Sequence, residues 1–220
     1  MTETDARDEI CRIGASLHSR GYAHGTAGNI SVRLADGFLI TPTDACLGFL
    51  DPARLARLDA SGRQVGGDRA SKTIALHTAI YAAASRYDAA TACVIHTHSA
   101  HGVALTMGAP RDELLAPITP YFVMKVGHVP VVPYDRPGAP AVALRVSEAI
   151  RRYGDAGTPI RAVMLARLGP NVWHDTPGAA MAVLEELEET ARLVALAGHA
   201  IEPLTGPQID ELRSTFGARW

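Results

Sequence analysis

The stretch CVIHTHSAHG, residues 93–102, joins a short apolar run to two closely spaced histidines. The run 93–95 is typical of a buried strand, and His96 and His98 follow where that strand ends. Side chains alternate along a strand, so the two imidazoles point to one face with their Cα atoms roughly 7 Å apart. Because a metal–nitrogen bond is about 2 Å long, both can reach one divalent ion. The pair predicts a metal site, and two hydrogen-bonded core histidines are the alternative interpretation.

The bulk composition indicates one globular domain. The chain has 220 residues, 47% of them hydrophobic, which is enough for a single core over residues 1–220. The formal net charge of −2 argues against a nucleic-acid partner. No apolar run approaches the ~20 residues of a membrane span. The three cysteines are odd in number and widely spaced, which predicts reduced thiols in a cytoplasmic protein.

Helices and strands are mixed along the chain without strict alternation. Two β-rich runs, 29–34 and 38–41, meet at Ala35-Asp36-Gly37 and predict a hairpin, whereas 44–70 is rich in loop residues. This mixture favours a three-layer α/β/α fold around a central, mainly antiparallel sheet. The other expected elements are strands at 92–97, 127–134, 162–166 and 170–174, and helices over 71–87, 99–107, 139–153, 177–198 and 207–216. A first helix is indicated by the apolar spacing over 10–17 and is expected to end near Gly21.

Two segments have the composition of anion sites. In GTAGNIS, residues 25–31, Gly28 frees the backbone to expose N–H groups and Asn29 adds amide donors. Ser71 and Lys72, at an expected helix start, would combine a hydroxyl, an ammonium and free helix N–H groups. A plain tight turn in the first segment, and a simple Ser71 N-cap with a solvated lysine in the second, remain the alternatives.

Taken together, these motifs resemble the class II aldolase/adducin family over about residues 8–197. The resemblance rests on GTAGNISVRLADGFLITPT at 25–43, SKTIALHTAIY at 71–81 and VIHTHSAH at 94–101, in this order and spacing. Within the family, the segments LITPTDACLG, ITPYFVMKVGHVPVVPYDRPG and VLEELEETARL are most similar to the branch of 3-oxo-tetronate 4-phosphate decarboxylases.

The resemblance implies an α/β/α fold and a homotetramer with sites between subunits. It also implies a divalent metal, usually Zn²⁺ with Mn²⁺ or Co²⁺ as alternatives, and a small sugar phosphate or sugar-acid phosphate as substrate. His96 and His98 match the family's paired metal ligands. The positions that match its phosphate pocket are Gly28, Asn29, Thr43, Ser71 and Lys72.

Three positions depart from the family pattern. Thr73 stands where the family usually has a glutamate, the base that moves protons in an aldolase. Leu168 replaces a third histidine ligand, in a dipeptide that usually reads His-Gly. Asp44 occupies a position where glycine is common, and its carboxylate would repel a phosphate. Outside candidates for the missing ligand are His24, His101 and Cys46.

The departures favour one reaction of the family over another. Family members stabilise an enediolate that forms when a carbon–carbon bond breaks. An aldolase needs a base to form it, whereas a 3-oxo acid loses carbon dioxide without prior deprotonation. Such a decarboxylase needs only an electrophile at the ketone and a later proton donor. Lys72, beside the metal, is a candidate for the electrophile, and Tyr121 is a candidate for the proton donor. Tyr121 as an interface or core aromatic is the alternative.

Three functions therefore remain open. The first is a metal-dependent lyase on a sugar-acid phosphate, acting as a decarboxylase, and the retained pair His96 and His98 favours it. The second is a binding or scaffolding protein that has lost its metal chemistry, which Thr73 and Leu168 favour. The third is an aldolase for a non-phosphorylated hydroxy-keto acid, which Asp44 favours.

Overall fold

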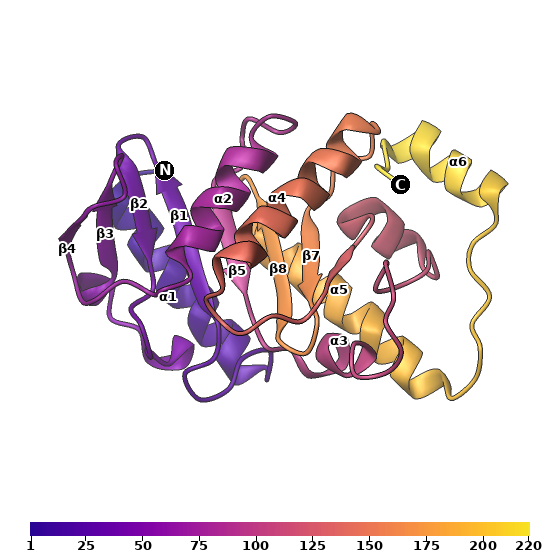
Figure 1. The fold of residues 1–220 in the computed structure, drawn as a ribbon, viewed down its shortest axis with the longest axis horizontal. Coiled ribbons are helices and arrows are strands. Elements are labelled where there is room, and N and C mark those ends of the chain that lie inside the picture. Colours follow the sequence, from indigo (N-terminus) through magenta and orange to yellow (C-terminus); the bar gives the residue numbers. More distant parts are fainter.

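The computed structural model describes residues 1–220 and contains a single eight-stranded sheet with helices on both faces (Figure 1). The strand order is β4-β3-β2-β1-β5-β8-β7-β6, and every neighbouring pair is antiparallel except β6 and β7. The expected three-layer α/β/α fold with a mainly antiparallel sheet is confirmed. The strands are β1 Asn29–Leu34, β2 Gly37–Ile40, β3 Ala56–Asp59, β4 Gln64–Gly66, β5 Cys93–His96, β6 Val131–Val132, β7 Ala162–Leu165 and β8 Gly169–His174.

The helices divide between the two faces of the sheet. Helices α1 and α5 pack on one face, together with the short α3 and a π-helical turn, η3. Helices α2 and α4 lie side by side on the other face (Figure 1). No helix is long and apolar enough to cross a membrane. The bounds are α1 Glu3–Ser19, η1 Leu47–Phe49, η2 Pro52–Arg54, α2 Ile74–Ala84, α3 Ala100–Leu105, η3 Phe122–Val126, α4 Pro140–Asp155, α5 Pro177–Ala197 and α6 Gly206–Phe216.

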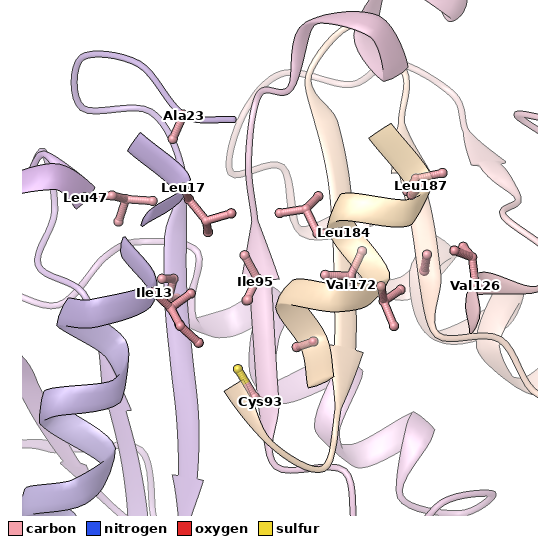
Figure 2. Packing of buried hydrophobic residues seen from close by; sticks show 14 of the residues in the cluster. Ile13, Leu17, Ala23, Leu47, Cys93, Ile95, Val126, Val172, Leu184 and Leu187 are labelled. Carbon is pink, nitrogen blue, oxygen red and sulfur yellow. The ribbon is translucent and has the colours of Figure 1, made fainter. Parts of the chain in front are cut away.

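Strand alternation divides the core into two layers. Ile95 and Val172 face α1 and α5, where Figure 2 shows them beside Leu184 and near Leu17. The neighbouring Val94 belongs to the smaller cluster under α2 and α4. The sheet is therefore apolar on both faces along most of β5, and its polar residues gather where that strand ends.

Most expected elements are present, with two corrections. The segment 44–70 contains β3 and β4, which the sequence did not predict because β3 has only four residues and every residue of β4 is exposed. The second correction concerns Ser71, which is not the N-cap of α2: that position is Thr73. Ser71 instead closes a tight turn, since its carbonyl accepts from the N–H of Ile74 at 3.1 Å. At the other end of the chain, Thr176 and Gly198 cap α5, which agrees with the helix expected over 177–198.

Candidate metal and substrate site

A large cavity lies at one edge of the sheet. Strand β8 lies between β5 and β7 and is antiparallel to both, so β5 and β7 point in the same direction. Strand β6 is parallel to β7 and therefore points in that direction too. The carboxyl ends of these three strands therefore meet the amino ends of β1 and β8 at one edge. A cavity of about 470 Å³ opens there, between the first turns of α2 and α4, and both His96 and His98 line it. Such clefts are the usual places for small-molecule sites.

Strand register places His96 in a polar row across the sheet. Asn29 of β1 and Asn171 of β8 are its direct partners on either side, so the three side chains point to the face covered by α2 and α4. Gly28 makes this row possible. Its φ is +89°, and a Cβ there would lie 2.8 Å from the carbonyl oxygen of His96, so only glycine fits.

The environment of His96 fixes both its charge and its tautomer. Burial lowers the pKa of His96 to about 4, and the nearby His98 adds to that shift. Burial likewise lowers the pKa of His98, with a smaller contribution from His24. Nδ1 of His96 lies 2.8 Å from the carbonyl oxygen of Pro170 and donates to it, which leaves the lone pair on Nε2. A neutral imidazole with one nitrogen bonded to a carbonyl is the form that binds metals.

The spacing of the two rings suits a shared ion. An ion about 2.1 Å from each nitrogen would lie about 3.2 Å from each ring centre, and a tetrahedral angle would then separate the centres by about 5 Å. The centroids of His96 and His98 are 5.0 Å apart. The two histidines therefore fit two positions of a metal's coordination sphere.

No third protein ligand joins them within one chain. No group of three His, Cys, Asp or Glu side chains is arranged to hold a metal. Leu168 lines the same cavity as the histidine pair, so the departure from the family pattern lies in the wall of the site itself. The outside candidates do not complete the site. The exposed His24 has its ring 6.3 Å from that of His98, His101 is bonded to Glu188, and Cys46 lines a neighbouring hollow.

The residues predicted to bind phosphate are brought together. All five line the cavity: Gly28, Asn29, Thr43, Ser71 and Lys72. The Ser71 hydroxyl is 2.8 Å from that of Thr73, which lines the cavity as well. The ammonium of Lys72 is exposed and forms no ion pair with the chain. Hydroxyls, amides and a free cation thus face one space, as anion binding requires.

Asp44 also faces this cavity, in a left-handed conformation with φ +57°. Aspartate adopts this region more readily than most residues, but glycine does so at no steric cost. The conformation accounts for the glycine common at this position in the family. The Asp44 carboxylate makes no ion pair and adds negative charge to the wall that also contains Lys72 and Ser71.

Tyr121 is not part of this cavity. It is 60% exposed and precedes η3, which packs against α5 on the opposite face of the sheet. Within one chain the structure therefore does not bring the predicted proton donor to the histidine pair.

The structure adds buried polar groups that the sequence did not predict. His77 of α2 is fully buried, and its Nδ1 lies 2.7 Å from the hydroxyl of Ser31, which in turn contacts that of Tyr81 at 2.8 Å. Nε2 of His77, Oδ1 of Asn29 and both amide atoms of Asn171 have no hydrogen-bond partner in the chain. Polar atoms without partners are rare in protein interiors, so this cluster beside His96 requires an explanation.

The fold and site together define a class: an α/β/α protein with a histidine pair and a glycine-containing loop lining one cavity at a sheet edge. Residues 8–195 match the class II aldolase and adducin N-terminal domain, and the chain belongs to that family. It is 50% identical over 228 residues to a 3-oxo-tetronate 4-phosphate decarboxylase of Cupriavidus necator, covering 100% of this chain and 99% of that protein. The protein of the same name from Escherichia coli is 41% identical over 216 residues, covering 96% and 97% of the two chains.

Solved structures agree with this assignment. YgbL from Escherichia coli superposes with a TM-score of 0.85 at 40% identity, covering 96% of this chain and 99% of its own. An L-fuculose 1-phosphate aldolase with 22% identity has the same fold, with a TM-score of 0.82 over 99% and 98% of the two chains. Decarboxylases and aldolases of this family are carbon–carbon lyases, and they share this fold.

Proposed function

We propose that the protein is a metal-dependent carbon–carbon lyase that decarboxylates a 3-oxo-tetronate 4-phosphate type substrate. The observation that supports this proposal most is the cavity shared by His96, His98 and the anion-binding residues. A substrate with a ketone and hydroxyl beside the histidines and a phosphate beside Lys72 would use both groups of side chains. Full-length relatives named for that reaction support it further.

The metal in this proposal is a divalent ion, with Zn²⁺ first and Mn²⁺ or Co²⁺ as alternatives. His96 and His98 would hold it, and it would supply a Lewis acid for the 3-oxo group and for the enediolate that forms as carbon dioxide leaves. Because only two protein ligands are available, we expect weaker binding than at a three-ligand site.

The chain's own residues would bind and orient the substrate. Lys72, with the Ser71 hydroxyl and the Asn29 amide, would hold the phosphate, and Gly28 lets the backbone approach it closely. Thr73 provides no base, and decarboxylation needs none before the carbon–carbon bond breaks. This requirement is the reason that decarboxylation is preferred over aldol cleavage at this site.

We also propose a homotetramer in which neighbouring subunits complete each other's sites. Tyr121, exposed on the outside of one chain, would then be a proton donor to the site of a neighbour. This arrangement explains how a residue outside the cavity could return a proton to the product.

Asp44 favours a second candidate, an aldolase for a non-phosphorylated hydroxy-keto acid. The test compares carbon dioxide release from 3-oxo-tetronate with and without its 4-phosphate, in the wild type and in Lys72→Gln. The proposal predicts turnover of the phosphorylated acid with a KM at least ~10-fold higher in K72Q. Carbon dioxide release from the free acid alone would contradict the role of the phosphate. Aldol cleavage of a non-phosphorylated hydroxy-keto acid, without carbon dioxide release, would favour the second candidate, and no turnover of either kind would favour a binding protein.

A further inference from the structure

A second cation without an ion-pair partner, Arg136, lines the cavity beside Lys72. Arg136 belongs to the segment between β6 and α4, and its guanidinium makes no hydrogen bond or ion pair with the chain. Most arginines of this protein do have such partners, for example Arg57, which contacts both Glu3 and Asp36. An unpaired arginine in a cavity that already holds an unpaired lysine indicates a ligand with more negative charge than one cation neutralises.

The local turn holds Arg136 in place. Pro137 and Gly138 occupy its central positions, Gly138 has φ +79°, and the N–H of Ala139 donates to the carbonyl of Arg136 at 3.1 Å. Proline followed by a glycine of positive φ is the pattern of a type II turn. The N–H of Arg136 donates to Asp135 at 2.8 Å, and Asp135 lies 3.6 Å from Arg145 of α4. The backbone of the turn is therefore fixed, and only the Arg136 side chain is free to move.

The charges of the cavity are not balanced within the chain. Arg145 is the ion-pair partner of Asp135, so Asp44 is the remaining carboxylate in the wall, against Lys72 and Arg136. Two cations without ion-pair partners, one on each of the segments that lead into α2 and α4, suit a ligand with two separate anionic groups.

We propose that Arg136 binds an oxyanion of the substrate, so that the cavity recognises a doubly anionic acid through Lys72 and Arg136 together. This inference rests on the proposed function and specifies its substrate class. The planar guanidinium can form two parallel hydrogen bonds to a carboxylate or a phosphate, which a lysine cannot. Both oxyanions occur in a phosphorylated 3-oxo acid, and the experiment distinguishes them.

A contact with the phosphate and a contact with the carboxylate have different kinetic consequences. If Arg136 binds the phosphate, its contact is the same before and during the reaction, so removing it raises KM and leaves kcat unchanged. If it binds the carboxylate, that group loses its charge in the transition state. The contact then stabilises the substrate more than the transition state, and removing it raises KM and kcat together.

The test measures the binding of inorganic phosphate and of phosphoglycolate by titration calorimetry in wild type, Arg136→Gln and Arg136→Lys. Arg12→Gln is the matched control, because Arg12 is an exposed arginine on α1, far from the cavity in sequence and paired only with Glu9. We expect R136Q to weaken phosphoglycolate binding ~10- to 100-fold, R136K to weaken it less, and R12Q to have no effect.

The pattern of losses identifies the oxyanion. An equal loss for inorganic phosphate supports a phosphate contact, and a loss confined to phosphoglycolate supports a carboxylate contact. Wild-type binding of phosphoglycolate that R136Q leaves unchanged would overturn the role of Arg136 and leave the proposed function standing. A wild type that binds neither probe would overturn both. Thermal unfolding of each variant checks that the fold is intact, and both Arg136 and Arg12 are exposed.

Discussion

Restoring the missing ligand is the sharpest perturbation of the histidine pair. Leu168 is half-buried, lines the cavity with His96 and His98, and packs only at the edge of the smaller core cluster. Leu168→His would place a third imidazole in the same wall with little loss of packing. Structural zinc sites with four protein ligands are stabilised by ~10–16 kcal/mol, or about 3 kcal/mol per ligand. At ~1.4 kcal/mol for each tenfold, L168H should lower the Kd for Zn²⁺ about 100-fold.

The assay is a zinc titration against a competing chelator at constant pH. Leu168→Asn is the control, because asparagine is polar and of similar size but contributes no imidazole. We expect the wild type and L168N to bind zinc with similar, weak affinity and L168H to bind it about 100-fold more tightly. If L168H binds no more tightly than L168N, position 168 does not reach an ion held by the pair, and the reasoning is wrong.

Three further predictions concern charge and stability. The lowered pKa values of His77 and His96, about 3 and about 4, mean that the unfolded chain takes up more protons as pH falls from about 6.5. The free energy of unfolding should therefore fall by about 1.4 kcal/mol per pH unit for each of these histidines down to pH ~4. His77→Gln should make the slope measured by urea unfolding shallower by about that amount, and an unchanged slope would contradict the reasoning. Asn171→Val removes two buried amide atoms that have no hydrogen-bond partner in the chain. It should raise the free energy of unfolding by about 1–3 kcal/mol and Tm by several degrees, whereas a lower Tm would indicate an internal water bound to the amide. Asp44→Gly removes the strain of a left-handed residue but gives the unfolded chain more conformational freedom, so Tm should stay within a few degrees of the wild-type value. Phosphate affinity should rise several-fold because a negative charge is removed, and an unchanged affinity would show that the carboxylate does not face the anion.

Much of the fold was predictable from local patterns. The run before His96, the hairpin at Asp36 and the caps Thr176 and Gly198 each depend on a few neighbouring residues, and all of these elements are present. The strands β3 and β4 were not predicted, because β4 has no buried residue and is held by pairing with β3 alone. A strand that depends on its partner has little pattern of its own to detect.

The candidate site was predictable in part. The histidine pair and each segment predicted to bind phosphate are short contiguous motifs, so a chemistry could be proposed for them before their arrangement was known. Asn171 and Arg136 could not be assigned, because both lie far from the histidine pair in the chain. Strand register places Asn171 beside His96, and the loop between β6 and α4 brings Arg136 to the cavity. Tyr121 shows the converse: its motif resembles the family's, but one chain alone leaves it outside the cavity.

The most direct test of the central claim is the metal content of protein purified without chelator, measured by elemental analysis beside a His96→Ala, His98→Ala double variant. The account predicts up to about one zinc, manganese or cobalt ion per wild-type chain, taken up on reconstitution where binding is weak, and none in the variant. It also predicts that carbon dioxide release from the phosphorylated 3-oxo acid is lost with the metal. A wild type that neither contains nor takes up metal, or a double variant that retains full activity, would contradict the account.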